Sequence, residues 1–83
     1  MNATTGLQLG LTASDGALRR VLGTVEHRGF RVHALHVESS ADGTQYRVRL
    51  EVAGERDPEL LTRQLLRLYD VHDVEVRPDM AAV

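Results

Sequence analysis

Short stretches in which apolar and polar residues alternate predict four β-strands, because the side chains of a strand point to opposite faces with a period of two. Leucine occupies every second position from residue 7 to residue 11. In residues 46–52 the apolar side chains alternate with arginine and glutamate, so that strand should have one wet face. Residues 31–38 carry apolar side chains on both faces, and a last strand is expected over residues 71–77.

Two segments between these strands carry apolar residues three and four positions apart, which is the spacing of one helix face. The first predicted helix covers about residues 16–27, after a serine-aspartate pair at 14–15 whose side-chain oxygens can cap it. Gly29 is expected to stop this helix in the left-handed conformation. The second helix covers about residues 57–69 and opens with an aspartate N-cap and a proline at the first helical position.

The order βαββαβ predicts a ferredoxin-like α+β fold, in which a four-stranded antiparallel sheet carries both helices on one face. A chain of 83 residues has room for one hydrophobic core. We therefore expect a single domain over residues 6–78, with poorly ordered tails at residues 1–5 and 79–83.

The composition argues against several classes of protein. The formal net charge is −2, so the overall charge does not attract nucleic acid or an anionic membrane. Cysteine is absent, which removes disulfides and thiolate chemistry and favours a cytoplasmic location. No apolar run approaches the ~20 residues that span a bilayer, and no export signal is found, so we expect no membrane partner.

Nothing in the sequence has the spacing of a catalytic or metal site. His33 and His36 differ by an odd number along one strand and should project from opposite faces. Ser14 lacks the G-x-S-x-G setting of an activated nucleophile, and no Gly-Lys-Ser/Thr follows Gly16. Tyr46 is the only aromatic on a central strand and is in phase with the core, so no platform for stacking RNA bases is predicted. We expect no catalytic residue, no metal and no nucleic-acid partner.

Two segments carry a resemblance to a known family. Residues 15–37, DGALRRVLGTVEHRGFRVHALHV, combine a Gly-Ala-Leu turn, an Arg-Val pair and an Arg-Gly-aromatic motif, and residues 67–76 read RLYDVHDVEV. Both segments resemble the ACT domain of the small regulatory subunits of acetolactate (acetohydroxyacid) synthase. The length of the chain is similar to that of the short, isozyme II type.

The resemblance implies a regulatory chain that is not itself an enzyme. Its partner would be the large catalytic subunit, which holds thiamine diphosphate, a magnesium ion and FAD and condenses pyruvate with a second 2-oxo acid in branched-chain amino-acid synthesis. This chain would hold no cofactor. It would stabilise or activate the large subunit and, in many relatives, confer feedback inhibition by valine. The alternative is a free-standing ACT module that senses an amino acid.

An amino-acid effector would place its carboxylate on backbone N–H groups at the start of the first helix, where Gly16 permits close approach. A glycine needed only for the turn explains this residue equally well. In valine-responsive relatives two asparagines help to hold the ligand, and the matching positions here are Ala13 and Arg31. Because both amide side chains are missing, we expect valine inhibition to be weak or absent. The candidate effector-binding residues are Ala13, Ser14, Asp15, Gly16, Ala17, Phe30 and Arg31.

The second predicted strand is expected at an edge of the sheet. Its apolar residues favour pairing with the same strand of a second copy, which would give a homodimer with one continuous sheet. The candidate dimer-edge residues are Val32, Ala34, Leu35 and Val37. On the uncovered sheet face, Arg47, Arg49 and Glu51 either stay solvated or meet the catalytic subunit.

Overall fold

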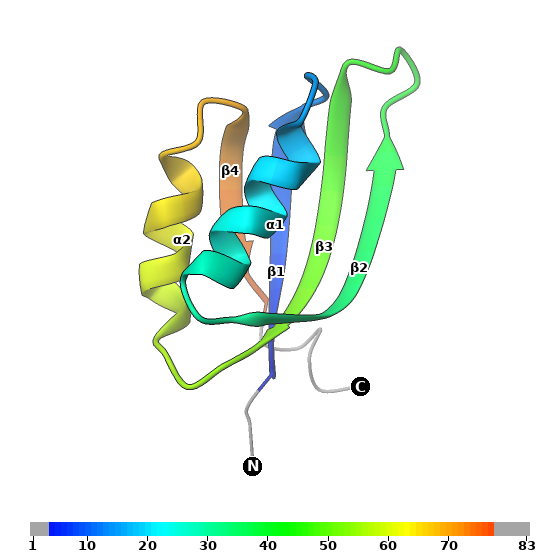
Figure 1. The fold of residues 1–83 in the computed structure, drawn as a ribbon. Helices are drawn as coiled ribbons and strands as arrows, with labels where there is room; N and C mark the ends of the chain where they lie inside the picture. Colours follow the sequence, from blue (N-terminus) through cyan, green and yellow to red (C-terminus); the bar gives the residue numbers. More distant parts are fainter. Residues whose placement is uncertain (1–3, 78–83) are drawn as a thin grey trace.

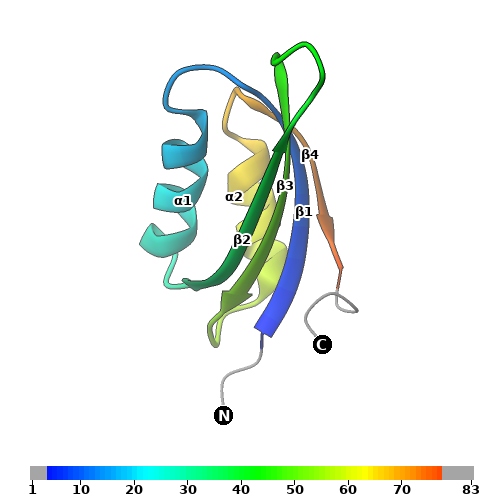
Figure 2. The ribbon, with the colours of Figure 1, turned by 90° about the vertical axis from the view of Figure 1, so that its right-hand side faces the viewer.

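The computed structural model describes residues 4–77, in which two helices pack on one face of a four-stranded sheet (Figure 1). The elements are β1 (Thr4–Thr12), α1 (Ala17–His27), β2 (Arg31–Ser39), β3 (Gln45–Ala53), α2 (Pro58–Leu66) and β4 (Val71–Val76). The strand order is β2-β3-β1-β4, and all neighbouring strands are antiparallel. Both helices lie on the same side of the sheet, and no described element covers the other side (Figure 2). The ferredoxin-like βαββαβ fold expected from the sequence is confirmed.

The ends of two elements differ from the expectation. β1 begins at Thr4, so residues 4 and 5 are not a tail; Thr4 pairs with Ala53 and continues the ladder between β1 and β3. α2 ends at Leu66, before Tyr69, because the chain tightens there: the amide of Leu68 donates to the carbonyl of Leu65 at 3.1 Å. The tails expected at residues 1–3 and 79–83 lie outside the described residues, as does residue 78.

A β-bulge in β2 corrects the prediction that both faces of this strand are apolar. The register between β2 and β3 shifts between Val32 and Ala34, so one extra residue of β2 is accommodated there. As a result Val32, Leu35 and Val37 stand opposite Val52, Leu50 and Val48, which are the buried residues of β3. The large apolar side chains of β2 therefore share the helix-covered face, whereas Ala34 stands opposite Glu51 on the open face. The bulge also interrupts the strict alternation that placed His33 and His36 on opposite faces.

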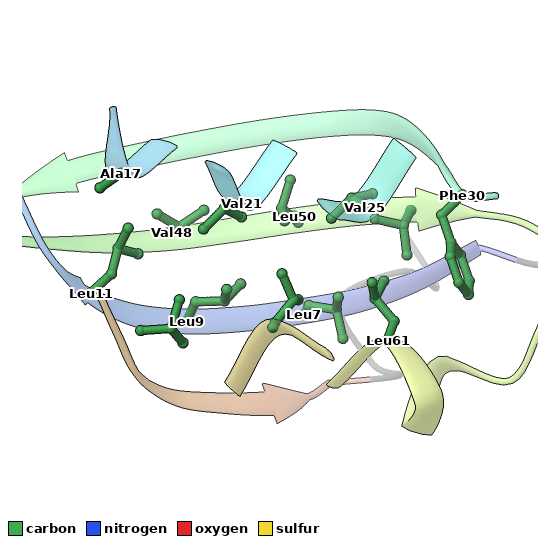
Figure 3. Close-up of a cluster of buried hydrophobic side chains, with 13 residues drawn as sticks. Leu7, Leu9, Leu11, Ala17, Val21, Val25, Phe30, Val48, Leu50 and Leu61 are labelled. Atoms are coloured by element: carbon green, nitrogen blue, oxygen red, sulfur yellow. The ribbon is translucent and has the colours of Figure 1, made fainter. Parts of the chain in front are cut away.

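The core fills the space between the sheet and the helices (Figure 3). The leucines of β1, at every second position, and every second residue of β3 point toward the helices. Each helix contributes one stripe of apolar side chains. The fully buried side chains include Leu7, Leu9, Leu11, Val21, Val25, Val48, Leu50, Val52, Leu61 and Leu65. Gly29 ends α1 with φ 90°, as expected, and the side chain of Asp57 caps α2 by accepting from the amide of Glu59 at 3.0 Å.

Candidate functional site

The turn between β1 and α1 is built around Gly16, which has φ 78° and ψ 4° at the N-cap of α1. No side chain of the described residues caps the helix, and this corrects the capping role expected for Ser14 and Asp15. Ser14 instead contributes its carbonyl, which accepts from the amide of Ala17 at 3.0 Å, and its hydroxyl, which donates to the carboxylate of Asp70. A glycine is required at the cap because an L side chain is strained at this φ.

The first turn of α1 leaves backbone donors open. The first bond of the helical ladder runs from the amide of Arg20 to the carbonyl of Gly16 at 2.9 Å. The amides of Gly16, Leu18 and Arg19 precede that bond, and no backbone acceptor for them is found in residues 4–77. Such amides, together with the positive end of the helix dipole, form a place where an anion is stabilised.

Asp70 fastens this turn to the start of β4. Its side chain is 2% exposed, and its carboxylate accepts from the Ser14 hydroxyl and from Arg20 Nε at 2.7 Å. These hydrogen bonds, that of Arg20 first and that of Ser14 second, hold the pKa of Asp70 below its usual value against the opposing effect of burial. The carbonyl of Asp70 also accepts from the amide of Thr12 at 2.8 Å. One buried carboxylate therefore holds both sides of the turn.

Two guanidinium groups flank the open amides. A Cβ placed on Gly16 would lie 3.0 Å from both Arg19 Nη2 and Arg20 Nη1. Arg20 also donates from Nη2 to the carbonyl of Asp15 at 2.9 Å and lies 5.0 Å from the centre of the Tyr69 ring. The hydrogen bond to Asp70 raises the pKa of Arg20 above its usual value. The turn thus offers unpaired N–H donors beside fixed positive charge, which suits a carboxylate.

Comparison with known proteins identifies the family of this chain. The ACT domain family matches residues 13–74, the segment that begins at the turn and ends in β4. The small subunit of acetolactate synthase isozyme 2 from Escherichia coli K12 is 39% identical over 59 residues, which cover 71% of this chain and 68% of that protein. The same subunit from Shigella flexneri matches equally well. The chain belongs to the family of acetolactate synthase small subunits.

Solved structures agree with the ACT fold. The ACT domain of GTP pyrophosphokinase from Chlorobium tepidum superposes with a TM-score of 0.76 at 13% identity, over 93% of this chain and 100% of that one. Formyltetrahydrofolate deformylase from Burkholderia mallei gives 0.73 at 15% identity, over 92% of this chain and 28% of that enzyme. At these identities the likeness establishes the fold alone.

A single ACT domain does not bring the expected effector residues together. Residues 13–17 lie at the N-terminal end of α1, whereas Phe30 and Arg31 follow its C-terminal end. An 11-residue helix separates the two groups by about 16 Å. Ala17 is 1% exposed and its amide is already bonded, so it belongs to the core and has no free donor. Phe30 is likewise a core residue, 4% exposed.

Asp70 was not among the residues singled out from the sequence, because its partners Ser14 and Arg20 lie 56 and 50 residues away along the chain. The available signal was that Asp70 is the one carboxylate in the segment from Leu65 to Val71, in which all other residues except Arg67 are apolar. β2 does lie at an edge of the sheet, where Ala34 and Leu35 are exposed and Val32 and Val37 are half-buried.

Among residues 4–77, no three His, Cys, Asp or Glu side chains gather as metal ligands. None of the described helices is long and apolar enough to cross a membrane.

Proposed function

We propose that this chain binds the large catalytic subunit of acetolactate synthase and stabilises or activates it, as a regulatory subunit in branched-chain amino-acid biosynthesis. The observation that carries the proposal is the 39% identity to the isozyme 2 small subunit over 68% of that protein. The ACT fold, which spans the matched segment, supports it. In this proposal thiamine diphosphate, magnesium and FAD belong to the large subunit, and this chain supplies contacts alone.

A homodimer paired through β2 would complete the effector site. β2 is an edge strand, whose outer side pairs with no other strand of residues 4–77, and its helix-side face carries Leu35, which is 43% exposed. Antiparallel pairing of two such strands about a two-fold axis reverses the direction of the second strand. The second copy's Arg31 would then lie at the end of the assembly where this copy has Gly16. This arrangement joins the two groups of candidate residues that one chain keeps apart.

The chemistry of the turn favours a carboxylate ligand but offers little to an amino group. In the valine-responsive relatives the two asparagines supply side-chain oxygens, whereas Ala13 and Arg31 supply a methyl group and a positive charge. An ammonium group that is buried without acceptors loses its hydrogen bonds to water and gains none from the protein. We therefore propose that valine inhibits the assembled enzyme weakly or not at all.

The test is co-elution of this chain with the acetolactate synthase large subunit of the same genome, combined with an acetolactate assay. Co-elution and a higher rate or longer lifetime of the large subunit are expected, with little response to valine. Strong inhibition by valine that depends on this chain would refute the effector part alone. Binding of a free amino acid without any association with the large subunit would instead identify a free-standing sensor.

A further inference from the structure

A groove runs between α1 and α2 on the side of the helix layer that faces away from the sheet. It consists of two adjoining hollows of about 330 and 400 Å³, which share His27, Arg28 and Gln64 in their walls. The first hollow has an apolar floor of Phe30 and Leu61, with Leu60 at its side. We call this surface the α1–α2 groove. α2 lies on the side of α1 away from β2, so pairing through β2 leaves the groove open (Figure 1).

The ionisable side chains that line the α1–α2 groove are all basic. Its walls contain four arginines and a histidine, and no aspartate or glutamate of residues 4–77 lines either hollow, although the whole chain has a net charge of −2. Arg20 is neutralised by Asp70. Arg28 donates to the uncharged Gln64 at 2.7 Å, and Arg56 and Arg67 have no ion pair within residues 4–77. The guanidinium groups of Arg28, Arg56 and Arg67 therefore lack a negative partner in the described part of the chain.

Gly23 supplies a second observation that points to a partner. It lies in the middle of α1 and in the wall of the groove, and it is exposed. Its backbone is not among the positive-φ glycines, and a Cβ there would meet nothing within 4 Å. Glycine weakens a helix interior relative to alanine, and nothing in the described chain requires it at this position. The space above it allows another backbone to approach the helix closely.

We propose that the α1–α2 groove receives an acidic segment of the large catalytic subunit, whose backbone crosses over Gly23 and whose apolar side chain enters the hollow beside Leu60. The inference rests on the proposed function and names the surface that performs it. Leu60 is 51% exposed above the buried Phe30 and Leu61, which is the setting of an apolar anchor. Arg28, Arg56 and Arg67 provide charge-assisted hydrogen bonds to carboxylates, a contact for which arginine is well suited.

The charge of the groove is tested with Arg67→Glu, and Arg49→Glu is the matched control on the open sheet face. The affinity of the full chain for the purified large subunit is measured by calorimetry at low and at high salt. The reversal in the groove should weaken binding about tenfold or more and flatten its salt dependence, while the control should stay near wild type. Thermal melts of each free variant verify that it is folded.

The space over Gly23 is tested with Gly23→Gln, which introduces a good helix former and a longer side chain. The free chain should melt at a higher temperature while its affinity for the large subunit falls. A glycine with no partner predicts higher stability with unchanged affinity, and that result would overturn the inference. Loss of affinity in Arg49→Glu with none in Arg67→Glu would also overturn it and move the contact to the open sheet face. If the wild-type chain does not bind the large subunit, the proposed function and this inference fail together.

Discussion

Replacing Gly16 with alanine tests whether the turn between β1 and α1 depends on its backbone conformation. Gly16 has φ 78°, where an L residue is disfavoured by about 1–2 kcal/mol. The new Cβ would lie 3.0 Å from Arg19 Nη2 and Arg20 Nη1, but both atoms end flexible side chains and can move aside. The backbone term should therefore dominate, and the free energy of unfolding should fall by about 1–2 kcal/mol.

For a domain of this size such a loss lowers the melting temperature by about 4–16 °C, which thermal unfolding followed by circular dichroism resolves easily. The matched control is Gly43→Ala, where φ is 76° and no atom lies within 4 Å of the added Cβ. Both variants should lose similar stability, because they share the backbone strain and differ only in the arginines. An unchanged melting temperature for Gly16→Ala, with a lowered one for the control, would refute this reasoning.

Three further outcomes follow from the structure. The pKa of Asp42 is lowered to about 2 by the hydroxyls of its own turn, so its contribution to stability is complete above about pH 4 and is lost as the pH falls toward 2. The pKa of Asp70 is lowered as well, mainly by its hydrogen bond from Arg20, so its contribution is also lost in acid. Urea titrations at falling pH should therefore show a smaller acid loss in Asp70→Asn and Asp42→Asn than in wild type. Leu9→Ala removes a fully buried side chain and should cost about 2–5 kcal/mol in a denaturant titration, and a cost below about 1 kcal/mol would contradict the assigned core. Leu35→Glu places a charge on the exposed edge of β2 and should shift sedimentation from dimer to monomer with little change in melting temperature, whereas a variant that remains dimeric would place the dimer contact elsewhere.

The order of elements could be predicted from the sequence because each strand and helix shows its own period. The bulge in β2 was missed because strict alternation was assumed through residues 31–38. Val32 and Leu35 are both apolar but lie three positions apart, so strict alternation would place them on opposite faces. The bulge allows both to lie on the helix-covered face. A local sequence pattern therefore predicts whether a segment is a strand or a helix more readily than it predicts an extra residue within a strand.

The candidate site was only partly predictable, for two physical reasons. Ser14 was expected to cap α1, but the carboxylate of Asp70, 56 residues away, takes its hydroxyl instead. No local pattern reports such a long-range contact. The second reason is that Gly16 and Arg31 lie at opposite ends of α1 within one chain, so a site that contains both needs a second copy, and a single sequence does not state how copies pair.

If this chain acts through the acetolactate synthase large subunit, as proposed, it must change the activity of that subunit when the two proteins are mixed. The most direct measurement is a titration of the purified large subunit with the full chain, in which the rate of acetolactate formation is followed as the ratio of the two proteins increases. The rate should rise and level off at a fixed ratio of small to large subunit. A rate that stays flat across the titration, with the two proteins sedimenting separately, would contradict it.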